Sequence, residues 1–80
     1  MVRDPRALLW DAQTSGTAIT RFLTGKSLSD FLADELLRSA VERQFEILGE
    51  ALAQLSKADP ELVSRIPDAR NAIGFRNVLI

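Results

Sequence analysis

The residues from Asp34 to about Lys57 constrain the fold more than any other part of the sequence. They include no proline and only one glycine, so little in the segment opposes a helix. Apolar residues return every three or four positions, the spacing that places side chains on one face of an α-helix. That face carries Leu37, Ala40, Val41, Gln44, Leu48, Ala51, Leu52 and Leu55. The sequence therefore predicts one long amphipathic helix here.

The apolar face of this helix is unusually wide. Leu36 and Ile47 extend it at one margin and Phe45 extends it at the other, so that it covers nearly half of the circumference. A helix on the surface of an ordinary domain needs an apolar arc of somewhat more than about 100°. A wider arc favours packing against two neighbours. We therefore predict an all-α antiparallel helical bundle that forms a homodimer or a higher homo-oligomer.

A cap residue followed by proline predicts the start of two further helices. Asp4 and Pro5 open a helix that Gly25 would end, because a cap side chain accepts hydrogen bonds from the first turn and proline lacks one N–H group. Asp59 and Pro60 repeat this pattern and predict a short helical turn.

Two other features fill the first half of the chain. Residues 27–30 read Ser-Leu-Ser-Asp and resemble a capping box, which predicts a short turn with Phe31 and Leu32 facing inward. Trp10 lies nearly opposite the apolar stripe of the first helix, so it indicates a second contact surface there.

The last segment begins at Pro67 and ends in the apolar run Val78-Leu79-Ile80, without a glycine or a capping residue. A helix that ended there would leave about four carbonyl groups without intrahelical partners. We therefore expect residues 1–80 to be a single domain that lacks its C-terminal part, with a fourth helix only begun.

The composition excludes several kinds of site. The chain has no cysteine, histidine or tyrosine, which rules out a thiolate metal site and a Ser-His-Asp triad. No glycine-rich phosphate loop is present, and we expect no cofactor and no metal. The formal charge of −1 does not favour general nucleic-acid binding, although a local basic patch remains possible. No secretory signal or membrane span is visible, so we expect a cytoplasmic protein.

Arg43, Glu46 and Glu50 share the polar side of the long helix, at spacings of three and four residues. Such a stripe is usually a solvated surface. Alternatively, it lines a cleft or contacts a partner, and Gly49 beside it would let another backbone approach closely.

Arg76 and Asn77 combine a cation and a carboxamide inside an apolar run. A guanidinium group binds two phosphate oxygens at once, so the pair could hold a phosphate. The alternative is structural, with Arg76 reaching solvent or pairing with a carboxylate such as Glu46.

Two stretches of the chain resemble the HepT family of HEPN ribonucleases. Residues 34–51 read DELLRSAVERQFEILGEA and residues 76–80 read RNVLI. Family members carry a central helix of the form D-x-x-x-x-x-A-V-x-R-x-x-E-I-I-G-E-A. A proline-containing turn follows, and then G-x-R-N-x-L-I-H-x-Y. The similarity runs along nearly the whole chain.

The resemblance implies a dimeric helical bundle that cleaves RNA without a metal ion. Each subunit would contribute an Arg-x4-6-His motif to a cleft at the dimer interface. Arg76 matches the motif arginine and Asn77 the polar residue after it, while Arg43 and Glu46 match positions that could orient these groups. The family also implies a toxin that is silenced by a cognate MntA-like nucleotidyltransferase antitoxin, which adds AMP to the motif tyrosine.

The sequence departs from this pattern because the motif histidine and tyrosine do not occur in it. We therefore predict that the 80-residue chain by itself does not cleave RNA. Two alternatives remain open. The chain could be a non-catalytic module for dimerisation or antitoxin binding, or a substrate-binding helical domain associated with a nucleotidyltransferase.

Overall fold

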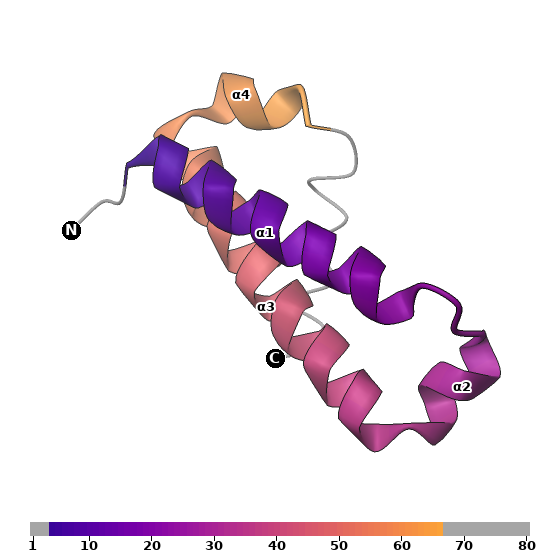
Figure 1. Ribbon diagram of the computed structural model, residues 1–80. Helices are drawn as coiled ribbons and strands as arrows, with labels where there is room; N and C mark the ends of the chain where they lie inside the picture. The colour runs from indigo at the N-terminus through magenta and orange to yellow at the C-terminus, as the bar shows by residue number, and fades with distance from the viewer. Residues whose placement is uncertain (1–3, 67–80) are drawn as a thin grey trace.

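The computed structural model describes residues 4–66, which form four α-helices and no β-strand (Figure 1). In chain order the helices are α1 (Pro5–Leu23), α2 (Leu28–Ala33), α3 (Glu35–Ala58) and α4 (Pro60–Ser64). The described part of the protein is therefore all-α, as the hydrophobic spacing predicts. The predictions for residues 67–80 fall outside the described residues.

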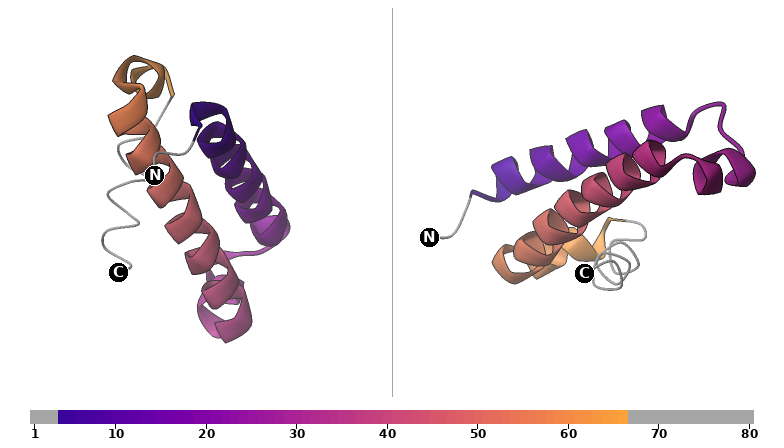
Figure 2. Two further views of the ribbon diagram at one scale, coloured as in Figure 1. Left: turned by 90° about the vertical axis from the view of Figure 1, so that its left-hand side faces the viewer. Right: turned by 90° about the horizontal axis from the view of Figure 1, so that it is seen from below.

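The two long helices α1 and α3 form an antiparallel hairpin. They lie side by side in all views, with α2 at the end where the chain turns and α4 at the opposite end (Figures 1 and 2). Leu8 of α1 and Leu55 of α3 are completely buried between them. A second group of buried residues holds α4 against the hairpin. It contains Ala12, Ala51 and Leu52, with Leu48, Val63 and Ile66 packed around them.

The predicted caps are present at both proline-led helices. The carboxylate of Asp4 accepts a hydrogen bond of 2.8 Å from the backbone N–H of Arg6, and Asp59 accepts one of 3.1 Å from Leu62. Gly25 follows α1 with a φ of 76°, in the left-handed region that glycine adopts without strain. These local signals therefore set the ends of α1 and the start of α4.

The capping box at α2 is also confirmed. The hydroxyl of Ser27 accepts a bond of 3.0 Å from the Asp30 N–H, and the Asp30 carboxylate accepts one of 2.9 Å from the Ser27 N–H. The prediction that Leu32 faces inward is wrong, because its side chain is 60% exposed. α2 has only six residues, and Phe31 is already half-buried on its inner side, so the next residue points outward.

The long helix was predicted to within one residue at each end. The carboxylate of Asp34 caps α3 by accepting a bond of 3.0 Å from the Leu37 N–H. Gly49 is buried, as a packing role requires. The apolar arc is narrower than expected near the start of α3, because Leu36 is 80% exposed. None of the helices within residues 4–66 is both long enough and apolar enough to cross a bilayer.

Candidate active site

An open hollow of about 230 Å³ lies along the junction of α1 and α3. Its lining contains all three residues of the predicted polar stripe, Arg43, Glu46 and Glu50. The remaining lining residues are Leu8 and Asp11 from α1 and Ile47, Ala51 and Gln54 from α3. The stripe thus borders a concave surface with an apolar floor.

Helical spacing explains how α3 contributes four polar side chains to one hollow. Arg43, Glu46, Glu50 and Gln54 follow one another at intervals of three, four and four residues, which keeps them on one side of the helix. The same turns direct the apolar side of α3 toward α1. The hollow therefore follows from the margin at which the polar and apolar sides of α3 meet.

Arg43 and Glu46 form an ion pair with 3.5 Å between the guanidinium Nη1 and the carboxylate Oε2. Their side chains are 66% and 43% exposed. A pair this open to water contributes little to stability, about 0–1 kcal/mol. Its main effect is on orientation, because the carboxylate of Glu46 holds the guanidinium of Arg43 over the hollow.

The carboxylate of Glu50 is held from the other side by Gln54. The Gln54 Nε2 donates a hydrogen bond of 3.0 Å to the Glu50 Oε1, and the pair is partly buried. A carboxylate that is half-buried and hydrogen-bonded has few rotamers open to it, so its position in the hollow is restricted.

Asp11 and Gln54 were not identified as site residues from the sequence. Gln54 continues the stripe by one more turn, which is a signal that spacing alone could have supplied. Asp11 lies at the edge of the buried side of α1, four residues from the buried Ser15 and three from the buried Leu8. Its place in the hollow depends on how α1 and α3 pair, and no pattern within α1 encodes that pairing.

The hollow is net negative, since three carboxylates line it together with a single guanidinium. A phosphate group would be repelled unless another cation joined the site. Within residues 4–66, no group of three His, Cys, Asp or Glu side chains is arranged to hold a metal ion. The interactions within the hollow include the Arg43–Glu46 ion pair and the Gln54–Glu50 hydrogen bond.

The two residues predicted to be catalytic, Arg76 and Asn77, lie outside the described residues. The structure brings Arg43, Glu46 and Glu50 together, and it leaves the position of Arg76 relative to them as a prediction.

Residues 13–80 match the model of the family described as "Ribonuclease HepT-like". The chain belongs to the HepT-like ribonuclease family. The matched range includes most of α1, the whole polar stripe of α3 and the Arg76-Asn77 pair. The resemblance inferred from the central helix is thus confirmed at the level of the family.

A relative in the archaeon Methanocaldococcus jannaschii supports the same assignment. The chain is 31% identical to the protein named "Putative RNase MJ1380" over 78 residues, which cover 98% of this chain and 71% of that protein. No solved structure gives a significant match. The all-α hairpin of α1 and α3 is thus the core of a HepT-like chain.

Proposed function

We propose that this HepT-like chain is a subunit of a metal-independent endoribonuclease. The observation that carries the proposal is the family match, because it includes the Arg76-Asn77 pair as well as the polar stripe. The hollow along α3 adds support, since it gathers polar groups of the predicted supporting face at one place.

In the proposed reaction, the ribose 2′-hydroxyl attacks the adjacent phosphorus and the bond from phosphorus to the 5′-oxygen breaks. The products are a 2′,3′-cyclic phosphate and a free 5′-hydroxyl. The guanidinium of Arg76 stabilises the charge on the phosphorane oxygens, and Asn77 helps to hold the phosphate. The family's motif histidine would accept the proton of the 2′-hydroxyl and return one to the leaving oxygen.

A cleavage assay tests this assignment directly. The 80-residue chain contains no histidine, so we expect no cleavage of single-stranded RNA above background. A chain extended after Ile80 by the family's His-x-Tyr should cleave, with its rate unchanged by a chelator. In that chain Arg76→Ala should lower the rate about 100-fold or more. Cleavage that survives Arg76→Ala would remove the proposed role of this arginine.

The supporting role of Glu46 can be separated from folding. In the extended chain, Glu46→Gln should release Arg43 and lower the cleavage rate about tenfold, because small displacements of a positioning group cost this much or more. The change should alter stability by less than about 0.5 kcal/mol, since the pair is exposed. The matched control is Glu61→Gln, which breaks the exposed pair of Glu61 with Arg65 and should leave the rate unchanged. Equal effects of both variants on the rate would argue against a role for Glu46.

The proposal includes a homodimer, because α3 carries apolar side chains that α1 and α4 cover only in part. Leu48 and Phe45 are only half-buried within the hairpin. Sedimentation velocity at micromolar concentration should give twice the mass of one chain. A well-folded monomer at that concentration would contradict a shared cleft.

A toxin role and an antitoxin partner complete the proposal. Expression of the extended chain should arrest bacterial growth, and co-expression of an MntA-like nucleotidyltransferase should restore it. Growth arrest that such an enzyme does not relieve would separate the ribonuclease from this mode of control.

A further inference from the structure

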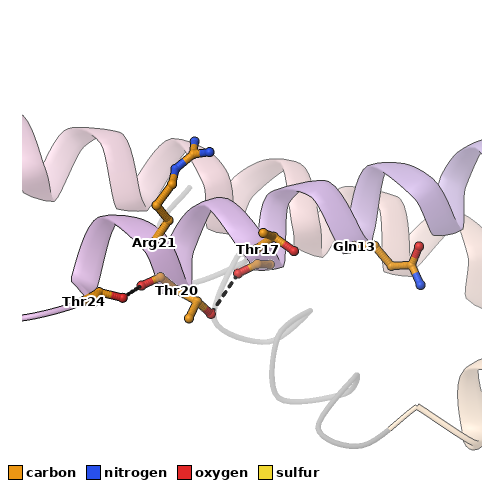
Figure 3. Close-up of a pocket in the computed structure, with 6 residues that line it drawn as sticks. Gln13, Thr17, Thr20, Arg21 and Thr24 are labelled. Carbon is orange, nitrogen blue, oxygen red and sulfur yellow. Dashed lines mark hydrogen bonds between the residues drawn. The ribbon is translucent and has the colours of Figure 1, made fainter.

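The side of α1 that faces away from α3 is rich in threonine. It contains two adjacent shallow hollows that share Gln13, Thr17 and Arg21. The first is completed by Gly16, Thr20 and Thr24, and the second by Trp10, Thr14 and Ala18. We call these nine residues the outer face of α1. Figure 3 shows Gln13, Thr17, Thr20 and Thr24 along the lower edge of the helix, with Arg21 extending upward from it in this view.

The charge of this face is opposite to that of the α3 hollow. None of the described residues that line the two depressions is acidic, and Arg21 supplies a positive charge. The Arg21 guanidinium carbon lies 5.4 Å from the centre of the Phe22 ring, so the cation is supported by an aromatic neighbour and its polar edge remains exposed. Arg6 has a helical position on the same side, but Asp4 pairs with it at 2.9 Å.

The face also offers a large aromatic surface. Trp10 is 65% exposed, which is unusual for a side chain of this size in a small helical protein. It lies 11 residues before Arg21, nearly on the same side of the helix, so about 16 Å of axial rise separates the two. A base could stack on the indole while the guanidinium contacts a phosphate further along the strand.

Two threonine hydroxyl groups near Arg21, one on either side of it in the sequence, are set to accept hydrogen bonds. The Thr20 hydroxyl donates to the Gly16 carbonyl at 3.1 Å, and the Thr24 hydroxyl donates to the Thr20 carbonyl at 2.7 Å. Because each hydroxyl hydrogen is used within the helix, the oxygens present lone pairs outward. An acceptor edge of this kind matches donors such as the ribose 2′-hydroxyl or a base amino group.

We propose that the outer face of α1 binds single-stranded RNA, through stacking on Trp10 and a phosphate contact to Arg21. This inference rests on the proposed function, which assigns RNA as the substrate. The proposal adds a second RNA-binding surface, which shares no residue with the α3 hollow. This surface holds nucleotides of the substrate away from the cleaved bond.

Trp10 is the single tryptophan of the chain, so its emission reports directly on this face. The 80-residue chain should be titrated with a labelled single-stranded RNA of mixed sequence, and both anisotropy of the label and tryptophan emission should be followed. We expect binding with quenching of the indole. Trp10→Ala should weaken binding about five-fold or more. Arg21→Ala should weaken it and reduce the salt slope by about one. The control Arg65→Ala removes an exposed arginine just after α4 and should leave affinity unchanged.

Several results would overturn the inference. One is the absence of RNA binding by the chain. Another is binding without quenching that Arg43→Ala reduces and Arg21→Ala does not, which would place the RNA at the α3 hollow. In a third, Trp10→Ala would dissociate a dimer in sedimentation while RNA affinity stayed unchanged, so that the face would be an interface between copies. The cleavage assay of the extended chain tests the proposed function separately, and cleavage there with unchanged binding in both α1 variants would reject this inference alone.

Discussion

At the scale of single residues, two of the carboxylates at helix starts, Asp4 and Asp30, have lowered pKa values. The guanidinium of Arg6 donates to the Asp4 carboxylate, and this hydrogen bond with that of the Arg6 N–H lowers the Asp4 pKa. The N–H and then the hydroxyl of Ser27 lower the Asp30 pKa. In both cases the hydrogen bonds in the folded protein favour the ionised carboxylate.

These lowered pKa values predict a loss of stability in acid. A group whose pKa is lower in the folded state stabilises the fold above its ordinary pKa, here 3.8, and this contribution disappears as the pH falls through the folded value. The melting temperature should therefore fall as the pH drops below 3.8. Asp30→Asn should melt lower than the original chain at neutral pH, and the difference should narrow in acid. Circular dichroism measures both, and a constant difference would show that ionised Asp30 contributes nothing.

Among the site residues, those that share one helix can be predicted from the sequence, and those brought in by another helix cannot. Arg43, Glu46 and Glu50 were identified because their spacing on one helix decides that they share a side. Asp11 was missed because its place in the hollow depends on the pairing of two helices. Arg76 and Asn77 remain predictions that only the family motif supports.

At the scale of the helices, local chemistry determines most boundaries. Caps, prolines and one glycine act within four residues, so α1, α3 and α4 begin where the sequence predicts. The exposure of Leu32 and Leu36 was not predicted. Both lie near the α2–α3 turn, where exposure depends on which neighbours are present. Periodicity describes a face of a helix, and only packing decides how much of that face is covered.

Alanine substitutions at two glycines, one inside α1 and one just after it, test how the backbone conformation at each position affects stability. Gly25 has a positive φ and Gly16 lies inside α1, and a Cβ atom at either position would meet nothing within 4 Å. Any effect of alanine is therefore conformational. Gly25→Ala should lower the free energy of unfolding by about 1–2 kcal/mol. Gly16→Ala should raise it by about 0.5–1 kcal/mol. Urea denaturation distinguishes the two, and a neutral Gly25→Ala would mean that the turn after α1 does not limit stability.

At the scale of the whole molecule, the hairpin depends on a narrow seam of buried aliphatic side chains. Leu55 is completely buried, whereas Leu36 on the same helix is 80% exposed. Leu55→Ala should cost about 2–5 kcal/mol, through lost burial and the cavity left behind. Leu36→Ala should change stability by less than about 0.5 kcal/mol. Denaturant titrations of both variants check this seam, and similar losses would show that another surface holds the helices together.

The antiparallel arrangement of α1 and α3 also bears on the order of events during synthesis. Only residues 24–34 separate the two helices, so the chain forms its main contacts between segments that are close in sequence. A nascent polypeptide could join them once Ala58 has left the ribosome, before its later residues emerge. Translation would then present a preformed helical hairpin to the segment that carries Arg76, which would dock onto it last.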